Sequence, residues 1–317
     1  MRDLVILAAG MGTRFGGPKQ LEAVGPSGAT ILDYSIHDAR RAGFGKAILV
    51  IRREMASAFE KNVIARWRSR FCVEVAFQET DDLPGGLSLS PGRTKQWGTG
   101  HALLAASEFV GGPFATLNAD DFYGHEAFGQ LAAFFDTRLE EAAPAYAVVG
   151  FPLGKTLSHS GAVNRAVLHA DDQQWLTDIE EVPGIVPREI ITGPTYSADA
   201  GDNFTSGIGN RCVTGDGRTL AGELPVSMNM WGFTRAIFSQ LAAQFGEFLR
   251  KFAADPNAEF LLPSAVQSLV RRREAKVKVL RAEGQWSGIT HRDDKVAVAA
   301  MLRRLTEAGT YPADLWA

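Results

Sequence analysis

Apolar runs and helical patterns alternate along the first half of the chain, and this alternation limits the fold more than any other feature. Short runs rich in Val, Ile, Leu and Ala have the length of buried strands, at 4–10, 46–53, 72–78, 114–120 and 145–151. Segments with helical spacing lie between them, at 30–43, 54–69, 100–109 and 124–138. Strands joined by crossover helices form a largely parallel sheet with helices on both faces. The pattern therefore predicts an α/β fold in which ligands bind beyond the carboxyl ends of the strands.

The segment 30–43 carries the clearest helix signals. Its apolar residues fall on one face of a helix, Thr30 is suited to cap the first turn, and Gly43 is suited to end the last one. We therefore expect an amphipathic helix with these two residues at its ends.

The second half of the chain, from about residue 156, has a different sequence pattern. Residues 156–181 read as antiparallel strands with polar turns, and 183–223 are rich in Gly, Pro, Asp and Thr. Regular elements then resume as a buried strand, a helix, an edge strand and a closing helix, at 224–233, 234–252, 275–281 and 292–308. Since no linker composition separates the two parts, we expect a single domain over 1–317, with halves at 1–155 and 156–317.

Composition and charge narrow the class of protein. The chain has 317 residues, of which 45% are hydrophobic and 22% charged, as in ordinary globular proteins. A net charge of −3 provides no global basic field to recruit nucleic acid. The two cysteines, Cys72 and Cys212, lie far apart and form no metal-spaced cluster. With no secretion signal and no apolar run of membrane length, we expect a reducing cytoplasmic setting and no membrane partner.

The first predicted strand runs into a glycine-rich loop, "LVILAAGMGTRFGGPKQL" at 4–21. A dinucleotide-binding fold would start a helix inside the glycine run, whereas here the helical pattern waits until Thr30. That fold also places an acidic residue after the second strand to hold the ribose, where this chain has Arg52 and Arg53. A P-loop is excluded because no G-K-[S/T] follows the glycines.

Two cations in this loop indicate its ligand. A tight turn would explain the glycines, but not Arg14 and Lys19 beside them. Free backbone amides with two cations are suited to hold a polyphosphate and to stabilise charge that develops on phosphorus. The loop therefore predicts a nucleotide phosphate site.

The same residues resemble a known signature. "LAAGMGTRFGGPKQL" is similar to the L-A-A-G-x-G-T-R…P-K motif of the NDP-sugar pyrophosphorylases, the sugar-1-phosphate nucleotidyltransferases. The resemblance implies a GT-A-like, Rossmann-like fold: a mixed, mainly parallel sheet flanked by helices, with an inserted antiparallel region facing the sugar. It assigns nucleotide binding to 1–155, and sugar binding with the C-terminal helices to 156–317. The implied reaction joins an NTP, with UTP or dTTP favoured, to a sugar 1-phosphate and releases pyrophosphate.

The resemblance also assigns roles to residues of the loop. Arg14 and Lys19 would bind the phosphates and stabilise the transition state. No general base is required, because the attacking phosphate oxygen is already ionised, so catalysis rests on alignment and charge neutralisation. Backbone contacts with the nucleotide would come from Ala8, Ala9, Gly10, Gly12 and Thr13.

A glutamine and a glycine-threonine pair form the predicted base site. Gln78 ends a predicted strand, and "KQWGTGHALLAA" follows about twenty residues later. These residues resemble the family's Gln and G-T-G-H-A segments, which contact a pyrimidine base, so Gln78, Gly98 and Thr99 are assigned there. His101 is better explained as a satisfied residue at a helix start than as a catalytic group.

A strand end with two aspartates is the predicted Mg²⁺ site. "LNADDFYG", residues 117–124, resembles the strand end whose Asp holds Mg²⁺ in the family. Asp120 aligns with the ligand, and Asp121 would either support it from behind or cap the following helix. Few protein carboxylates are needed, because Mg²⁺ keeps waters and phosphate oxygens for its other positions.

A second metal ligand is expected late in the chain, in "WSGITHRDDK". Gly288 stands where the family most often has an aspartate, which leaves Asp294 or Asp293 as the candidate ligand. Capping of the helix at 295–307 explains the two aspartates equally well.

Three segments resemble the family's sugar site, and each contributes one candidate residue. "SGAVNR" contributes Gly161, "DIEE" contributes Glu180 and "SMNMWGF" contributes Asn229. Buried polar groups that match hydroxyls discriminate strongly between sugars, but their identity does not follow from the sequence.

Other functions remain open at this stage. The acceptor could be a small alcohol or polyol phosphate with CTP as the donor. A GT-A glycosyltransferase would use "ADD" as a metal-binding motif, although the G-T-R…P-K signature disfavours it. A regulatory nucleotide-binding module without activity is least supported, because Arg14, Lys19 and Asp120 are all present. The exposed arginines of 244–273 fit either a contact in a homo-oligomer or a solvated face.

Overall fold

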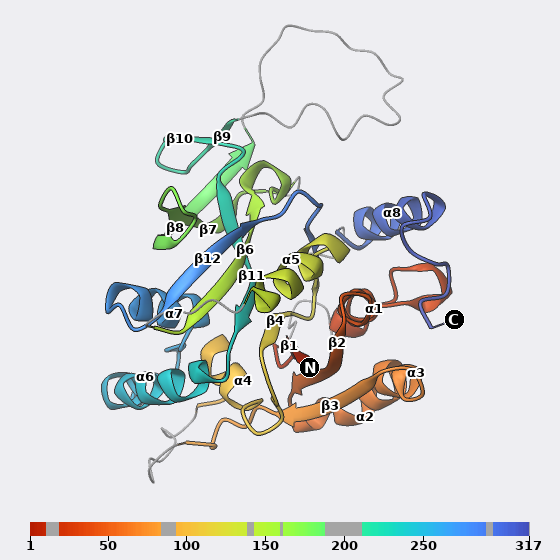
Figure 1. Cartoon of the computed structure of the whole chain (residues 1–317), viewed down its shortest axis with the longest axis horizontal. Helices are drawn as coiled ribbons and strands as arrows, with labels where there is room; N and C mark the ends of the chain where they lie inside the picture. The colour runs from red at the N-terminus through yellow and green to blue at the C-terminus, as the bar shows by residue number, and fades with distance from the viewer. Residues whose placement is uncertain are drawn as a thin grey trace, which may run out of the picture.

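The computed structural model describes residues 1–10, 19–83, 93–137, 143–158, 161–187, 211–289 and 294–316. Over these residues the strands form one eleven-stranded sheet and a small two-stranded one, with helices packed on both sides (Figure 1). The path through the large sheet is β10-β9-β8-β7-β11-β4-β1-β2-β3, with β6 beside β11 and β12 beside β6. The predicted α/β fold with a mixed, mainly parallel sheet is confirmed.

The first half of the chain forms the parallel half of the sheet. It consists of β1 (Arg2–Leu7), β2 (Phe44–Ile51), β3 (Cys72–Phe77) and β4 (Phe114–Asn118). β1 lies in the middle, parallel to β2 on one side and to β4 on the other. Each strand lies within the run predicted for it or within two residues of it. The carboxyl ends of these strands therefore meet at one edge, as the sequence predicts.

The chain from residue 145 onward supplies the antiparallel strands. They are β6 (Ala145–Pro152), β7 (Val163–Ala170), β8 (Leu176–Pro187), β9 (Arg211–Val213), β10 (Thr219–Ala221) and β11 (Pro225–Phe233). β11 joins the two halves, because it is antiparallel to β4, β6 and β7. β12 (Lys276–Arg281) is parallel to β6 and ends the sheet on that side, as expected for an edge strand.

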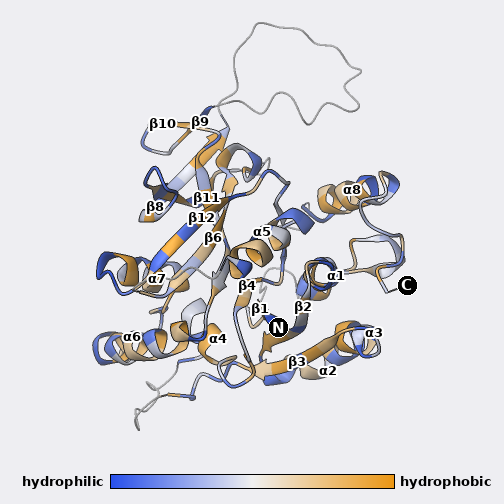
Figure 2. Cartoon of the chain, in the orientation of Figure 1, coloured by the Kyte–Doolittle hydropathy of each residue, from blue (hydrophilic) through white to orange (hydrophobic). Residues whose placement is uncertain are grey.

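The two faces of the sheet carry separate hydrophobic cores because side chains alternate along a strand. Leu4 and Ile6 face one core, and Val5 faces the other. The first core packs under α1 (Ile31–Arg41), α2 (Ala56–Phe59), α3 (Ala65–Trp67) and α5 (His125–Asp136). The second packs under α4 (Thr99–Leu104), α6 (Ala236–Phe252) and α7 (Leu262–Arg271). Figure 2 shows both hydrophobic and hydrophilic residues on these helices, as expected for helices that bury one face.

The ends of α1 follow the sequence signals. Thr30 accepts a hydrogen bond from the backbone N–H of Asp33, and the Asp33 carboxylate accepts one from the N–H of Thr30, which forms a capping box. Gly43 follows the helix with φ of 80°, a conformation that glycine adopts at little cost. The predicted helix at 54–69 is interrupted by a π-helical turn at Glu60–Ile64, and α4 is shorter than the predicted 100–109.

The end of the chain folds back against the first half. α8 (Asp294–Glu307) packs in a third apolar cluster near α1, together with β5 (Asp121–Phe122) and β13 (Ser287–Gly288), which pair with each other. The Tyr311 hydroxyl donates a hydrogen bond to the buried Asp38 carboxylate at 2.7 Å. This arrangement places residues 287–289 beside the segment that follows β4. No helix among the described residues is long and apolar enough to cross a membrane.

Candidate functional site

Side chains fix the backbone that follows β1 on both sides. Gln20 Nε2 donates to the carbonyl of Gly10 at 2.7 Å, and Arg52 Nε donates to that of Ala9 at 2.9 Å. Ala8 and Ala9 are buried, whereas Gly10 is exposed where the loop begins. The carbonyl oxygens of this segment are thus turned toward the protein, which fixes the start of the predicted phosphate loop. The predicted contacts of Gly12, Thr13 and Arg14 lie outside the described residues.

Lys19 and Asp120 meet at this edge of the sheet. Lys19 begins a short 3₁₀ turn at Lys19–Leu21, and its Nζ forms an ion pair with Asp120 Oδ2. The same Nζ donates to the carbonyl of Ile289 at 3.1 Å. Both charged side chains are partly exposed, at 20% and 24%, so a ligand can reach them. The fold thus brings together the residues assigned to phosphate and to metal, from positions 101 residues apart.

The neighbouring Asp121 is buried and held by two polar groups. Asn118 Nδ2 donates to Asp121 Oδ2 at 3.0 Å, and the Tyr123 hydroxyl lies 3.2 Å from the same oxygen. That hydroxyl donates its one proton to the carbonyl of Met228 at 2.7 Å, so the contact with Asp121 is best formed by a protonated carboxyl. Burial, and next the charge of Asp120, raise the pKa of Asp121 to about 8. Asp121 is therefore mostly protonated at neutral pH, beside the ion pair of Lys19 and Asp120.

The β5–β13 pairing explains the glycine at position 288. Gly288 is the register partner of Asp121, and the N–H of Ile289 donates to the carbonyl of Asp120 at 3.2 Å. A Cβ at position 288 would lie 2.6 Å from Asp121 Oδ1 and 2.7 Å from the Trp286 ring. The Asp121 carboxyl therefore occupies the space that a side chain at position 288 would need.

Asp294 begins α8 and lies in its first turn. Among the contacts that the structure describes, none joins Asp294 to Asp120, and Asp293 lies outside the described residues. Its role as a metal ligand stays a prediction.

The donor atoms at the end of β4 fit Mg²⁺ better than a metal that needs many protein ligands. The described part of the chain has no group of three or more His, Cys, Asp or Glu side chains that could hold a metal ion. Mg²⁺ is commonly held by one or two carboxylates, with waters and substrate phosphates completing its octahedron. Asp120, with Asp121 behind it, provides this donor set.

The predicted base site lies at the carboxyl end of β3. Gln78 is buried, and its Nε2 lies 3.2 Å from the carbonyl of Gly98 and 3.2 Å from His101 Nδ1. His101 Nε2 lies 3.2 Å from the carbonyl of Asp82. Burial lowers the pKa of His101, so the ring is neutral. Three of the residues singled out in the sequence therefore form one connected network.

The Gly98–Thr99 segment is held by the turn before α7. Gly98 has φ of 99°, and a Cβ there would lie 2.8 Å from the carbonyl oxygen of Phe260. The Thr99 hydroxyl oxygen accepts the backbone N–H of Leu262 at 3.0 Å, which satisfies the first turn of α7. Glycine is therefore required by close packing, and Thr99 has a structural task whether or not it contacts a base.

An irregularity in β11 places Asn229 beside the carboxyl end of β4. The register of β11 against β6 shifts between Ser227 and Trp231, and Asn229 has φ of 62° in this bulge. Trp231 pairs with Thr116 of β4, so the residues just before it lie beyond the carboxyl end of that strand. A non-glycine residue in this conformation carries backbone strain, which is often found at functional sites.

Arg165 is a cation near the aspartates that sequence reasoning did not single out. It lies on β7, next to the register pair of Ala166 and Ser227. Its Nε donates to the Thr156 hydroxyl at 3.2 Å, and its guanidinium lies 5.3 Å from the centre of the Trp286 ring. Burial lowers the pKa of Arg165, and the field of Asp121 opposes that shift.

The two other residues predicted for the sugar lie on the more exposed part of the sheet. Glu180 accepts from Arg218 at 2.8 Å and lies 3.0 Å from His169 Nε2, and these contacts lower its pKa. Gly161 is exposed before β7, with φ of 147°. No described contact ties either residue to Asp120, so their roles stay predictions.

Sequence reasoning missed the residues that hold the site together, namely Gln20, Arg52, Asn118, Tyr123 and Arg165. One signal could have identified several of them. Asn118, Tyr123 and Arg52 are polar residues at or just after the ends of predicted buried strands, where parallel strands present their side chains to a ligand.

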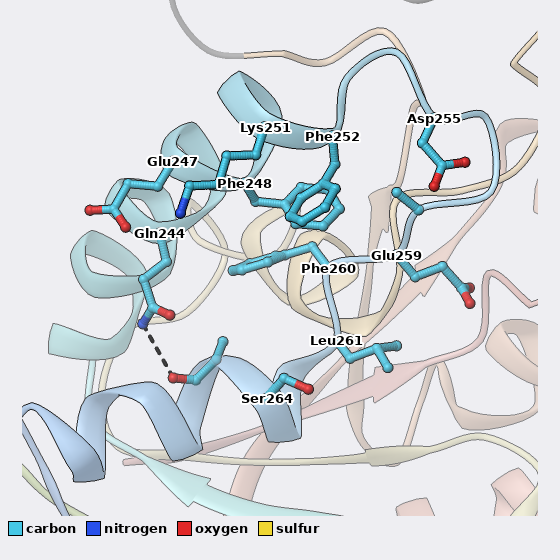
Figure 3. A pocket seen from close by; sticks show the side chains of 12 residues that line it. Gln244, Glu247, Phe248, Lys251, Phe252, Asp255, Glu259, Phe260, Leu261 and Ser264 are labelled. Carbon is cyan, nitrogen blue, oxygen red and sulfur yellow. Dashed lines mark hydrogen bonds between the residues drawn. The ribbon is translucent and has the colours of Figure 1, made fainter.

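A groove lies elsewhere, between α6 and α7, within the segment considered for an oligomer contact. It has a volume of about 480 Å³ and is lined by none of the residues assigned to phosphate, base, metal or sugar. Figure 3 shows aromatic side chains in its centre and charged ones around them, including Phe248, Phe252, Phe260, Lys251 and Glu259. Phe260 connects the groove to the site, because its backbone packs against Gly98.

Comparison with known proteins identifies the class. Residues 4–143 match the model of the MobA-like NTP transferase domain family, a match that spans somewhat less than half of the chain. This part of the chain is therefore similar to MobA-like NTP transferase domains, and the protein is a nucleotidyltransferase. The resemblance seen in the sequence is confirmed at this level. No curated protein matches the chain.

Solved structures share the fold over nearly the whole chain. An inositol-1-phosphate CTP transferase from T. maritima has a TM-score of 0.59 at 14% identity, with 97% of each chain covered. A UDP-glucose pyrophosphorylase bound to UDP-glucose has a TM-score of 0.57 at 15% identity, with 96% of this chain and 99% of that one covered. A Bacillus anthracis protein described as a glucose-1-phosphate thymidylyltransferase, in complex with sucrose, has a TM-score of 0.58 at 11% identity, with 96% of each chain covered. Identities this low show a common fold.

Proposed function

We propose that this protein is a Mg²⁺-dependent nucleotidyltransferase that joins an NTP, with UTP or dTTP favoured, to a sugar 1-phosphate and releases pyrophosphate. The observation that carries the proposal is the ion pair between Lys19 and Asp120. It places a cation from the phosphate loop against a carboxylate suited to Mg²⁺, where two adjacent parallel strands end. The NTP transferase domain at 4–143 supports the donor class, and the names of the similar structures support a phosphorylated acceptor.

In the proposed reaction an acceptor phosphate oxygen attacks the α-phosphorus of the NTP, and pyrophosphate leaves. The attacking oxygen is already ionised, so no side chain needs to remove a proton. Lys19, with Arg14 from the same loop, binds the phosphates and stabilises the charge that develops on them. Asp120, backed by Asp121, would hold Mg²⁺, which would supply charge neutralisation at the phosphates. Before substrates bind, the ion pair keeps Lys19 and Asp120 mutually neutralised.

The two halves of the sheet divide the substrates between them. The donor would lie over the ends of β1, β2 and β3, where the backbone of Ala8, Ala9 and Gly10 meets the triphosphate and the base reaches Gln78. The acceptor would lie over β11 and β7, where Asn229 can meet hydroxyls. Arg165 supplies a positive charge on that side, close to Asp121.

A cytidylyltransferase acting on a polyol phosphate is the second candidate. It is supported by the similarity to the inositol-1-phosphate CTP transferase, which covers 97% of both chains. The first and second candidates share the same chemistry and differ in base and acceptor. A glycosyltransferase is disfavoured, because residues 4–143 match an NTP transferase domain.

A matrix of donors and acceptors tests the proposal. Each of UTP, dTTP, CTP, GTP and ATP is combined with glucose 1-phosphate, other sugar 1-phosphates and inositol 1-phosphate, and pyrophosphate release is measured with Mg²⁺. We expect release with a sugar 1-phosphate, its loss on chelation and its recovery on adding Mg²⁺. Release only with CTP and inositol phosphate would favour the second candidate. Sugar transfer from intact NDP-sugars without pyrophosphate release would refute both.

A further inference from the structure

The orientation of the Gln78 side-chain amide is determined by its neighbours. The carbonyl of Gly98 lies 3.2 Å from the amide nitrogen. A carbonyl oxygen can only accept a hydrogen bond, so the amide NH₂ and not the amide oxygen must face it. This choice does not depend on any ligand.

The second neighbour of this nitrogen is His101. Its Nδ1 lies 3.2 Å from Gln78 Nε2 and must accept the other amide hydrogen. The imidazole proton is then on Nε2, where it donates to the carbonyl of Asp82 at 3.2 Å. His101 is buried, and its ring packs against Phe245 with centroids 4.9 Å apart. Both amide hydrogens of Gln78 are therefore used inside the protein.

Gln78 Oε1 is left as the reactive end of the side chain toward a ligand. It has no hydrogen-bond partner among the described residues, although Gln78 is only 3% exposed. Gln78 follows β3 at the edge of the sheet where Lys19 and Asp120 meet. A buried acceptor at this edge requires a donor from a ligand or from water.

We propose that His101 is a positioning residue that fixes Gln78 as an acceptor-only group, so that the site selects a nucleotide whose base carries a ring N–H over cytosine. Uracil and thymine carry this group at N3, and guanine carries it at N1. The inference rests on the proposed function, and it gives that function a base preference.

The selection follows from what a fixed amide cannot do. A free glutamine amide pairs with uracil through its oxygen and with cytosine through its nitrogen, because cytosine N3 is an acceptor. With the nitrogen occupied by Gly98 and His101, cytosine N3 would face Gln78 Oε1, and two acceptors would meet. An unpaired buried acceptor of this kind lowers kcat/KM by about 10- to 100-fold.

Nucleotide analogues test the inference on the unmodified protein. We expect kcat/KM to be highest for UTP, dTTP or GTP and at least about 10-fold lower for CTP and ATP. N3-methyl-UTP, which lacks the ring N–H, should have a kcat/KM as low as that of CTP. 5-Methyl-UTP, which carries a methyl group of the same size away from N3, should be accepted. Equal use of the two methylated nucleotides, or a preference for CTP, would overturn the inference.

A pair of variants tests the role of His101. His101→Leu removes the acceptor that holds the second amide hydrogen, so the ratio of kcat/KM for UTP to that for CTP should fall about 10-fold. His101→Asn keeps an acceptor oxygen near the position of Nδ1 and should preserve the ratio. A purely structural role would lower both kcat/KM values equally and leave the ratio unchanged in His101→Leu, which would overturn the inference.

Binding separates this inference from the proposed function. Calorimetry of UTP and CTP with Mg²⁺ measures base preference in the absence of turnover. Tighter binding of UTP without pyrophosphate release for any acceptor would support the base preference and refute the proposed reaction. Pyrophosphate release with equal binding and equal use of UTP and CTP would support the proposed reaction and refute the base preference.

Discussion

The parallel and antiparallel halves of the sheet hold their candidate residues in different ways. At the ends of the parallel strands, Gln78 and Asp121 are 3% and 8% exposed and are fixed by hydrogen bonds to buried neighbours. On the antiparallel strands, the Glu180 side chain is 36% exposed, and its partners Arg218 and His169 are 49% and 46% exposed. Exposed ion pairs contribute little to stability and rearrange easily. The comparison indicates that the candidate residues of the parallel half are held in place, whereas those of the antiparallel half can rearrange.

The largest effect is expected in the parallel half, at Lys19. Lys19→Ala removes the cation that we propose binds the transferred phosphate, so kcat should fall by at least about 10²-fold. The fold should persist, because Lys19 is partly exposed and makes one ion pair and one hydrogen bond. Steady-state kinetics measures kcat, and a thermal melt shows whether the fold persists. Lys251→Ala on α6 serves as the matched control. Turnover within a few-fold of the parent would remove Lys19 from the mechanism.

The next effect distinguishes the two candidate metal ligands. Asp120→Asn should lower kcat/KM by about 10²-fold and raise the Mg²⁺ concentration needed for half-maximal rate, because an amide carries no charge to attract the ion. Asp294→Asn should change neither quantity by more than a few-fold, since Asp294 lies at the start of α8. Mg²⁺ titrations of both variants give the comparison. A strong effect of Asp294→Asn on the Mg²⁺ requirement would support Asp294 as the second metal ligand.

Much of the parallel half could be predicted from local sequence signals. Apolar runs gave the strands, and Thr30 and Gly43 gave the ends of α1. The meeting of Lys19 with Asp120 follows from one rule, that adjacent parallel strands end at the same edge. Such signals are sufficient because each depends on a few neighbouring residues or on the topology alone.

The contacts that shape the site could not be predicted in this way. Gln20 and Arg52 hold the backbone after β1, and the Asp121 carboxyl occupies the space beside Gly288. Arg165 approaches Asp121 only because β11 lies between β4 and β7. Each of these contacts joins segments that are distant in sequence and depends on side-chain packing, which periodicity and motifs do not encode.

Arg165 is the exception in the antiparallel half, because its charge is partly buried beside Thr156 and Trp286. Arg165→Ala should raise the KM for the phosphorylated acceptor about 10-fold and leave the KM for the NTP nearly unchanged, since the lost cation faces the acceptor side. The control is Arg218→Ala, which removes an exposed cation that pairs with Glu180. It should change neither KM value by more than about 2-fold. An equal rise in both KM values for Arg165→Ala would show that the two halves do not divide the substrates.

The smallest expected effect is on the pH dependence of stability, at the buried His101. Burial lowers the pKa of His101 below the value of about 6.5 expected in the unfolded chain. As the pH falls below that value, the unfolded state therefore binds a proton that the folded state resists, and stability decreases until the folded pKa is reached. The decrease in Tm between pH 7.5 and pH 5.5 should thus be smaller in His101→Asn than in the parent protein. Lys251→Ala, which removes an exposed side chain on α6 and no imidazole, should keep the parent's decrease. Equal decreases in the parent and in His101→Asn would show that the base-side network is not held by a neutral, buried imidazole.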